Sequence, residues 1–350
     1  MPDTMKALVT TGDGKVTVKE IPVPKPAEGE VLVKIHYAAQ NPTDWKSSGY
    51  AKEAGRLVGC DFAGTVAESP DSKWRPGTRV AGWVHGCLPD PPRGVFAEYA
   101  IAESTLVFPI PDSVSFQDAA VVPLAFATAV QALFQRLQLP EPSKPAKSAF
   151  PILIYGGTSS VGKYAVQLAK MAGLFVIATA SKRNHELLKQ LGADATVDYN
   201  DADWVEQVKQ VSHEGLEYAF DCISEKETTP VVAQCLSPAK GGHVMCILPR
   251  KTAELPEALQ AKVRVESTIA YTVFGRPIKY GEFDNHGGET PADKAFWEKY
   301  LALLPGYLES GRVKPNKVKE FGGLEDIPKG FELHAQGKVS AEKLVYKIAP

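Results

Sequence analysis

The hydrophobic pattern of the chain changes once along its length. In the first part, short segments alternate apolar and polar positions between turns rich in glycine and proline, which is typical of strands with one buried face. The predicted strands are Val16–Ile21, Glu30–Ala39, Gly64–Glu68, Arg79–Val84 and Ala97–Ile101. Their irregular spacing and many glycines predict a partly open β barrel, followed by a helical stretch at Phe116–Leu137.

From Pro151 onward, apolar runs alternate with amphipathic segments. The predicted strands are Ile152–Tyr155, Phe175–Ala180, Ala195–Asp198, Tyr218–Cys222, Gly242–Ile247 and Val265–Val273. The predicted helices are Val161–Ala172, Asn184–Leu191, Trp204–Val211 and Thr228–Leu236. Because parallel strands need crossover helices, this rhythm predicts an α/β fold with a doubly wound parallel sheet. A helix at Lys294–Ser310 and a final strand at Lys338–Ile348, returning to the first domain, complete the pattern.

The turn between the first of these strands and its helix is the most informative segment. It consists of Gly156, Gly157, Thr158, Ser159, Ser160, Val161 and Gly162. A helix N-terminus offers unpaired N–H groups and a positive dipole end to phosphate, and glycine lets the backbone approach a pyrophosphate closely. The spacing departs from the strict Gly-x-Gly-x-x-Gly pattern, so a turn that binds nothing stays open as the alternative.

The end of the second strand in this series indicates which dinucleotide binds. Enzymes that use NAD place an Asp or Glu there, against the ribose 2′-hydroxyl. This strand instead runs into Ser181, Lys182, Arg183 and Asn184, whose cations and polar groups suit a 2′-phosphate. NADPH is therefore predicted over NADH. The alternative, a solvated helix start, would place two cations against the helix dipole.

Length and composition are those of a two-domain globular protein. At 350 residues the chain exceeds one ordinary core, and 44% hydrophobic and 23% charged residues are ordinary values. The net charge of −2 argues against nucleic acid as a partner. No apolar run reaches the roughly 18 residues that span a membrane, and the N-terminus has no apolar signal region. We therefore expect a cytoplasmic protein with no membrane partner.

The cysteine pattern favours neither disulfides nor a structural metal site. The number of cysteines, five, is odd, and no pair has Cys-x-x-Cys spacing. The seven histidines show no ligand spacing either. We expect mostly buried, packed thiols at Cys60, Cys87, Cys222, Cys235 and Cys246.

Over nearly its whole length the sequence resembles the medium-chain dehydrogenase/reductase superfamily. The landmarks are Asn41–Asp44, Gly59–Gly64, Trp74–Val80, Gly94–Tyr99 and Leu191–Ala195. The resemblance implies a β-rich, GroES-like catalytic domain at residues 1–122, completed by 276–350, and a Rossmann dinucleotide-binding domain at 123–275. Zinc alcohol dehydrogenases have a Cys ligand where Asn41 stands and Gly-His-Glu at residues 59–61, so we expect a zinc-independent protein.

A closer resemblance is to the stand-alone, trans-acting enoyl reductases of fungal polyketide pathways, of the lovastatin type. It rests on Tyr155–Thr158, Tyr218–Ile223, Glu227–Thr229, Gly241–His243, Phe274–Gly275 and Gly337–Val345. The resemblance implies NADPH-dependent reduction of an α,β-unsaturated thioester in secondary metabolism. The acyl chain would hang on the acyl carrier protein of a polyketide synthase, or of a hybrid with a nonribosomal peptide synthetase.

Carried across residue by residue, the resemblance also implies site residues. Those that would hold the nicotinamide and its ribose are Thr43, Asp44, Trp45, Lys46, Cys246, Ile247, Val339 and Ser340. The pyrophosphate would lie on Thr158–Val161, and the adenosine phosphate end on Ser181–Asn184 and Tyr199. Those that would line the acyl tunnel are Thr128, Gln131, Gln135, Val273, Phe274, Gly275, Arg276 and Pro277.

The expected chemistry assigns a role to two of these residues. A thioester carbonyl is already activated, so a hydride can be added to the β-carbon without a metal, an enolate oxygen then needs donors, and the α-carbon is protonated last. Lys46 is the candidate for proton delivery, with anchoring of the ribose as its alternative role. Thr128 is a candidate orienting hydroxyl, or else a helix-packing residue.

Two other functions stay open at this point. A free-standing quinone or enone reductase would use the same chemistry on diffusible small molecules, without a carrier protein. A dinucleotide-binding protein kept as a structural partner of a synthase would need no catalysis, but the intact Lys46 and glycine turn argue against it. We expect a monomer, with a dimer joined near Glu266–Val273 as the alternative.

Overall fold

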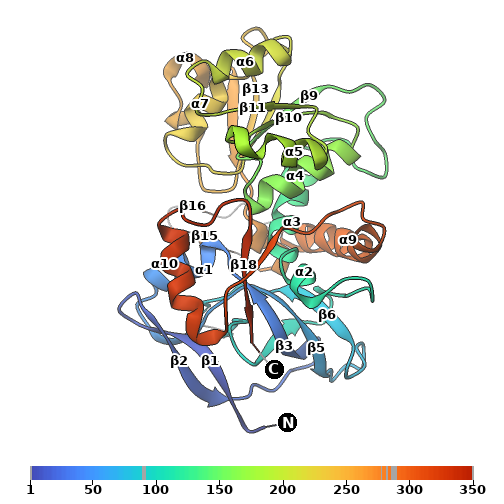
Figure 1. Ribbon diagram of the computed structural model, residues 1–350, viewed down its shortest axis with the longest axis vertical. Helices are drawn as coiled ribbons and strands as arrows, with labels where there is room; N and C mark the ends of the chain where they lie inside the picture. Colours follow the sequence, from blue (N-terminus) through green and yellow to red (C-terminus); the bar gives the residue numbers. More distant parts are fainter. Residues whose placement is uncertain (1, 89–91, 277, 281–282, 285–289, 349–350) are drawn as a thin grey trace. The chain divides into compact units, whose positions relative to one another are not determined.

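The computed structural model describes residues 2–88, 92–276, 278–280, 283–284 and 290–348 (Figure 1). It divides into two compact units. Unit 1 comprises Met1–Leu124 and Glu298–Pro350, and unit 2 comprises Ala125–Trp297. Each unit contains its own cluster of buried apolar side chains.

The centre of unit 2 is a six-stranded parallel sheet. Its strands are β9 (Pro151–Tyr155), β10 (Phe175–Thr179), β11 (Ala195–Val197), β12 (Tyr218–Asp221), β13 (Gly242–Cys246) and β14 (Val263–Ser267). Their order, β11-β10-β9-β12-β13-β14, is that of a Rossmann sheet, and the predicted doubly wound fold is confirmed. The order reverses between β9 and β12, so a ligand crevice is expected at the carboxyl ends of these two strands.

Helices connect these strands as crossovers. They are α4 (Ser160–Met171), α5 (His185–Gln190), α6 (Trp204–Val211), α7 (Thr228–Gln234) and α8 (Glu257–Gln260), with short turns η2 (Lys182–Asn184) and η3 (Thr252–Glu254). A small hairpin, β15 (Lys279–Tyr280) and β16 (Phe283–Asp284), also belongs to this unit. The chain builds the sheet outward from β9 in one direction (β10, β11) and then in the other (β12, β13, β14), and right-handed crossovers in such a sheet place helices on both of its faces.

The predicted strand Val265–Val273 is wrong in its second half. Strand β14 ends at Ser267, and Ala270–Phe274 forms a turn of 3₁₀ helix, η4. The Ile269 carbonyl oxygen accepts from the Thr272 amide nitrogen at 3.1 Å and lies 3.1 Å from the Thr272 hydroxyl. The backbone bond closes a turn, so the chain leaves the strand ladder here, and the alternation of residue types does not reveal it.

Unit 1 consists of a three-stranded and a seven-stranded sheet. Its strands are β1 (Thr4–Thr11), β2 (Val16–Pro22), β3 (Glu30–Ala39), β4 (Ala54–Leu57), β5 (Asp61–Glu68), β6 (Arg79–Trp83), β7 (Tyr99–Glu103), β8 (Val107–Pro109), β17 (Val318–Glu320) and β18 (Lys343–Lys347). Strand β18 pairs antiparallel with β3, so the end of the chain returns to the first sheet. In the core of this unit, the rings of Phe96 and Tyr346 meet edge to face at 5.9 Å.

The helices of unit 1 are short. They are α1 (Pro42–Tyr50), α2 (Phe116–Ala120) and α10 (Ile327–Ala335), with the turn η5 (Leu324–Asp326). Two helices contain a boundary between the units, α3 (Pro123–Val130) and α9 (Thr290–Glu309). The π helix η1 (Gln131–Arg136) follows α3 and belongs to unit 2. The predicted single helix Phe116–Leu137 is therefore three segments. Proline at Pro123 lacks an N–H group and disfavours helical backbone at the residue before it, which ends α2.

The cysteines agree with an expectation from the sequence. All five cysteines are free and buried, as expected of packed thiols. Burial raises the pKa of each of these thiols.

In the part of the chain that the structure describes, no helix combines the length and the apolar character needed to cross a membrane.

Candidate active site

The glycine turn after β9 is packed so closely that side chains are excluded from it. Gly156 has φ of +72°, and a Cβ atom there would lie 2.7 Å from Cγ1 of Ile223. A Cβ atom on Gly162 would lie 2.3 Å from the Gly156 carbonyl oxygen. Helix α4 therefore starts directly against the turn, and its N-terminus faces the carboxyl end of β9. This cradle fits a pyrophosphate.

A threonine that the sequence analysis did not single out fixes the turn. The Thr179 hydroxyl accepts from the Gly156 amide at 3.0 Å, and its carbonyl accepts from the Gly157 amide at 2.9 Å. At the other end of the turn, the Ser159 hydroxyl caps α4 by accepting from the Gly162 amide at 3.0 Å. The structure thus brings Gly156 to Val161 together at one helix N-terminus.

The predicted phosphate-binding segment at residues 181–184 lies in the exposed turn after β10. Lys182 and Arg183 are both exposed, and Asn184 donates to the Ser181 hydroxyl at 3.2 Å. The Lys182 amide donates to Oδ2 of Asp198 at 2.9 Å. Sequence reasoning missed this carboxylate, because it follows β11 and not β10. This turn therefore presents two cationic side chains, with one carboxylate hydrogen-bonded to its backbone.

Tyr199 lies at the end of β11, and 41% of its surface is exposed. Its ring centroid is 6.4 Å from that of Tyr155, the last residue of β9. Burial, followed by the nearby Asp221 charge, raises the pKa of Tyr155 to about 12, so its phenol stays protonated. The two rings form a partly exposed aromatic surface beside the turn.

A buried carboxylate organises the carboxyl ends of β12 and β13. Asp221 is fully buried and accepts from two amides and two hydroxyls, those of Ile223 (3.0 Å), Ser224 (2.7 Å), Thr228 (3.0 Å) and Thr229 (2.9 Å). The Ser224 hydroxyl accepts from the Ile247 amide at 2.9 Å, which ties the end of β13 to this turn. Sequence reasoning missed Asp221, although it is the one charged residue in the otherwise apolar run from Tyr218 to Ile223.

The predicted nicotinamide residues Cys246 and Ile247 are held at this edge. Cys246 is paired in register with Asp221 on the neighbouring strand. It is fully buried, and burial raises the pKa of its thiol to about 12. The thiol is therefore a packing group and not a nucleophile at neutral pH.

In unit 1, the predicted residues Thr43 to Lys46 lie on α1. The Lys46 ammonium lies 5.5 Å from the centre of the Trp45 ring, a cation–π distance. Trp45 and Val339 both pack against the apolar core of unit 1, and Ser340 follows Val339 in the chain. The indole N–H of Trp45 is buried without a hydrogen-bond partner in the protein, which is an observation that fits a polar ligand beside α1.

A buried ion pair lies under the start of α1. The Lys343 ammonium is 2.6 Å from Oδ2 of Asp61, and their side chains are 2% and 0% exposed. The ammonium also donates to Oδ1 of Asn41 at 2.9 Å, and Nδ2 of Asn41 donates to Asp61 at 2.9 Å. Since an ammonium only donates, the orientation of the Asn41 amide is determined. Lys343 was not singled out from the sequence.

Asp61 also fixes the start of α3. Its second oxygen, Oδ1, accepts from the Leu124 amide at 2.8 Å. Asn41 stands where the resemblance places a Cys ligand in zinc alcohol dehydrogenases, and here Asn41 and Asp61 both bind the Lys343 ammonium. Across the described ranges of the chain, no three His, Cys, Asp or Glu side chains are grouped to hold a metal ion.

The carboxyl group of Asp44 lies in the same buried cluster. Burial raises its pKa to about 7, and the Asp61 charge adds to this effect. The backbone N–H of Asn41 donates to Oδ2 of Asp44 at 2.7 Å. This bond, the Cys60 thiol and the Lys343 charge each lower the pKa of Asp44 and offset part of the rise. At neutral pH this group is therefore close to half protonated.

A neutral histidine lies within electrostatic range of Lys46. The Gln40 amide nitrogen donates to the Gly330 carbonyl at 3.1 Å and lies 3.0 Å from Nδ1 of His334. Nδ1 therefore accepts, and the imidazole proton is on Nε2. Burial, followed by the charges of Lys343 and Lys46, lowers the pKa of His334 to about 4.

The predicted acyl-tunnel residues that the structure describes lie on three segments of unit 2. Thr128 (9% exposed) is on α3, Gln131 (1% exposed) and Gln135 are on the π helix, and Val273 and Phe274 are buried in η4. Gly275 follows with φ of +69°, and the Arg276 guanidinium lies 5.7 Å from the Phe274 ring. Pro277 lies outside the described residues.

A cavity of about 480 Å³ lies at the amino ends of strands in the parallel sheet of unit 2, opposite the end that has the glycine turn. It is lined by Gln135, Arg136, Glu217, His243, Arg264 and Glu266, among others. Tyr218, Gly242 and Arg264 stand at the amino ends of β12, β13 and β14, whereas the glycine turn is at a carboxyl end. The cavity therefore has no part in the dinucleotide site.

Two family models match the sequence. One, described as an alcohol dehydrogenase GroES-like domain, matches residues 27–112. The other, described as a zinc-binding dehydrogenase, matches residues 160–283. The first covers most of the β-rich segment of unit 1, and the second covers most of the parallel sheet.

Curated relatives and solved structures match along the whole chain. A trans-enoyl reductase of Alternaria alternata is 36% identical over 99% of both chains. A zinc-type alcohol dehydrogenase-like protein of Schizosaccharomyces pombe is 37% identical, over 98% of this chain and 100% of its own. The CurK enoyl reductase structure superposes with a TM-score of 0.75 at 21% identity, over 99% of this chain and 100% of its own.

A side chain at Gly162 is expected to separate α4 from the glycine turn. In Gly162→Ala, the new methyl group would overlap the Gly156 carbonyl, so we expect the free energy of unfolding to fall by about 1–3 kcal/mol and the binding of a nicotinamide dinucleotide to weaken. Urea denaturation and fluorescence titration measure these effects. Gly306→Ala is the matched control, because nothing lies within 4 Å of its added Cβ and it stands in helix α9. Equal effects in both variants would contradict the close packing at Gly162.

Breaking one partner of the buried ion pair is expected to destabilise the protein strongly. Lys343→Met leaves the Asp61 carboxylate buried and unpaired, which costs about 3–5 kcal/mol in comparable pairs. The double variant Asp61→Asn/Lys343→Met removes both charges and should regain most of this loss. Chemical denaturation of the two single variants and the double variant gives the coupling energy. Losses below about 1 kcal/mol, as at exposed pairs, would contradict the interpretation.

The raised pKa of Asp44 predicts that stability falls as pH rises. The folded protein holds this proton up to about pH 7, whereas the unfolded chain releases it near 3.8. The folded state therefore binds more protons between these values, and the free energy of unfolding should decrease across the window by up to about 1.4 kcal/mol per pH unit, and then level off. Urea denaturation near pH 5.5 and pH 8 measures the slope.

Asp44→Asn is expected to remove this part of the slope, because the amide imitates the protonated carboxyl group. The variant should gain stability relative to wild type at the higher pH only. Asp112→Asn, at an exposed carboxylate, is the control. A difference between Asp44→Asn and wild type that does not change with pH would show that Asp44 does not titrate in this range.

Proposed function

The chain belongs to the trans-enoyl reductases of the medium-chain dehydrogenase/reductase superfamily, and from this premise we propose that it reduces an α,β-unsaturated polyketide thioester with NADPH. The acyl chain is carried by the acyl carrier protein of a polyketide synthase, or of a synthase–peptide synthetase hybrid, in fungal secondary metabolism. The observation that carries the proposal is 36% identity to a trans-enoyl reductase over 99% of both chains, together with the intact glycine turn and Lys46.

The residues present fit a dinucleotide. The closely packed turn and the N-terminus of α4 suit the pyrophosphate, and the exposed Lys182 and Arg183 suit a 2′-phosphate. The unpaired indole N–H of Trp45 suits a polar group beside α1. We assign dinucleotide binding to residues 123–275 and catalysis to residues 1–122 with 276–350.

The residues present do not fit a catalytic zinc ion, although one matching family model is described as zinc-binding. Lys343 places a positive charge 2.6 Å from the Asp61 carboxylate and 2.9 Å from the Asn41 amide oxygen. A second cation bound by the same two groups would be repelled. The proposed reaction is accordingly zinc-independent.

The protein's part in the reaction is to place donors and exclude water. When bound, NADPH supplies the hydride that the β-carbon accepts. The Lys46 ammonium would either deliver the proton or hold the ribose and the thioester carbonyl in place. The imidazole of His334 is neutral, so it adds no positive charge next to Lys46.

The acyl chain is proposed to lie along the residues carried over from the family. Thr128 would orient the thioester through its hydroxyl. Gln131, Gln135 and residues 273–277 would form the wall of the tunnel. Val273 and Phe274 are apolar and packed in η4, and an acyl chain entering beside this turn would lie against them.

Turnover of two acceptors tests the proposal. NADPH oxidation is followed with an α,β-unsaturated pantetheine thioester and, in parallel, with a simple quinone. We expect the thioester to be reduced, the quinone to be inert, and NADH to be a poor donor because it lacks the 2′-phosphate. Lys46→Ala should lower kcat/KM by about 10²-fold or more if Lys46 delivers the proton. If Lys46 only anchors the ribose, the loss should appear mainly as a raised KM for NADPH.

Lys52→Ala is the control, because Lys52 is exposed and lies just beyond the end of α1. Quinone turnover with a silent thioester would replace the proposal by a free-standing quinone or enone reductase. NADPH binding without turnover of either acceptor would favour a non-catalytic partner of a synthase. Equal use of NADH would contradict the role of Lys182 and Arg183.

A further inference from the structure

Helix α3 widens into a π helix where the sequence gives no reason for it. The segment Gln131–Arg136 contains neither proline nor glycine, and its residues favour an ordinary α helix or tolerate one. The Leu137 amide nevertheless donates to the Ala132 carbonyl, five residues back, at 3.0 Å. Such turns are rare and occur frequently at functional sites. An interaction outside the helix must stabilise the wide turn.

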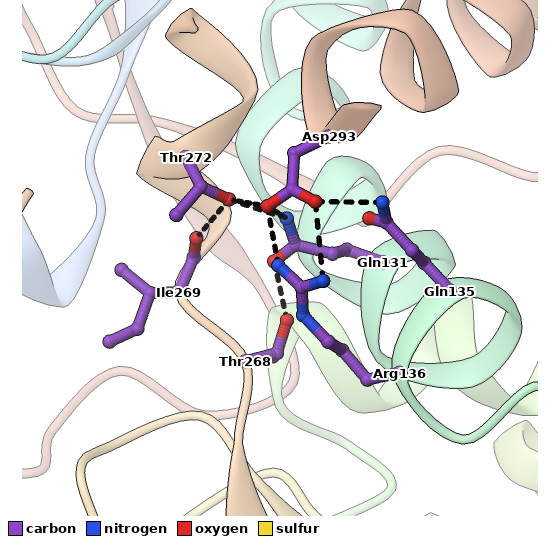
Figure 2. Close-up of polar contacts among 7 residues, drawn as sticks. All are labelled: Gln131, Gln135, Arg136, Thr268, Ile269, Thr272 and Asp293. Carbon is purple, nitrogen blue, oxygen red and sulfur yellow. Dashed lines mark hydrogen bonds and ion pairs between the residues drawn. The ribbon is translucent and has the colours of Figure 1, made fainter. Parts of the chain in front are cut away.

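The interaction is with the carboxylate of Asp293, near the start of α9 (Figure 2). Asp293 is fully buried. Its Oδ1 accepts from Gln135 at 2.7 Å and from Nη1 of Arg136 at 3.2 Å, and its Oδ2 pairs with Nη2 of Arg136. Since a π turn places residues i+4 and i+5 both above residue i, it brings Gln135 and Arg136 to the side of Gln131 that faces Asp293.

The same carboxylate holds the turn η4 from the other side. The Thr272 hydroxyl donates to Oδ2 of Asp293 and accepts from the Gln131 amide nitrogen at 2.9 Å. Thr268 donates to the Gln131 amide oxygen. The polar atoms of Gln131 are thus engaged on both ends, and Figure 2 shows the side chains converging from three segments.

Thr272 has only one hydroxyl proton, and the Ile269 carbonyl at 3.1 Å is a second acceptor for it. The charged carboxylate is the stronger acceptor. The hydrogen bond to Asp293 therefore fixes the position of the Thr272 side chain in η4. Val273 and Phe274 follow directly in the same short turn, so their positions depend on this hydrogen bond.

We propose that Asp293, acting through Thr272, is a positioning residue that determines which acyl chains the reductase accepts. The proposal rests on the proposed function, because it concerns the wall formed by Val273 and Phe274. A short acyl group reacts without using this wall. A long acyl chain must pack against it, so a displaced η4 penalises long chains selectively.

Thr272→Val tests the proposal, since it removes the hydroxyl but keeps the shape of the side chain and the Asp293–Arg136 ion pair. Crotonyl and 2-decenoyl pantetheine are the two substrates. We expect kcat/KM for 2-decenoyl pantetheine to fall about tenfold or more, that for crotonyl pantetheine to stay within about twofold, and the Kd of NADPH to be unchanged. Thr272→Ser, which restores the hydroxyl, should recover the wild-type preference.

Asp293→Asn should shift the preference in the same direction, because an amide nitrogen facing Gln135 and Arg136 cannot accept their hydrogen bonds. Asp194→Asn is the matched control: it breaks the Lys170–Asp194 ion pair of 2.6 Å in the same unit, away from η4. An equal loss on both substrates, or the same pattern in the Asp194 variant, would overturn the proposal.

Hydrogen exchange separates a failure of this inference from a failure of the proposed function. If wild-type protein reduces neither thioester, the proposed function is wrong. In that case, Thr272→Val should still accelerate exchange at residues 268–276 relative to residues 151–179. Unchanged exchange at residues 268–276 would show that Asp293 and Thr272 do not hold η4, whatever the substrate.

Discussion

The carboxylate of Asp61 is the interaction on which the arrangement of unit 1 depends. It binds the ammonium of Lys343 from β18, the amide of Asn41 at the start of α1 and the Leu124 N–H at the start of α3. These segments are far apart in the sequence, and the carboxylate joins them directly. A buried charge is stable only when it is paired and hydrogen-bonded. Burial of the Asp61 carboxylate therefore depends on Lys343, Asn41 and the Leu124 N–H together.

Unit 2 uses buried carboxylates for a related purpose. Asp221 collects two amides and two hydroxyls after β12, and Asp293 collects donors from the π helix and from η4. In each place the backbone leaves regular helix or strand geometry. A carboxylate oxygen accepts several hydrogen bonds, so it stabilises an irregular segment whose donors have no regular partner. The irregular segments, and not the strands, carry most of the candidate site.

The sequence predicts the regular part of this fold well and the irregular part poorly. The alternation of strands and amphipathic helices indicates the Rossmann sheet, because its period is visible within a few residues. The strand end at Ser267 depends on a local turn, and the break before Pro123 depends on one proline, and the hydrophobic pattern shows neither. The buried position of Lys343 could not be predicted, because its partner Asp61 is 282 residues away in the sequence. A lysine in a strand is usually exposed.

The burial of every cysteine has a practical consequence for studying this protein. Thiol reagents attack the thiolate form, and these five thiols are inaccessible and poorly ionised. The native chain is therefore already a suitable background for site-specific labelling, with no need to remove its own cysteines. A cysteine introduced at Tyr50, whose side chain is 78% exposed at the end of α1, would carry a fluorophore on the helix that presents Lys46.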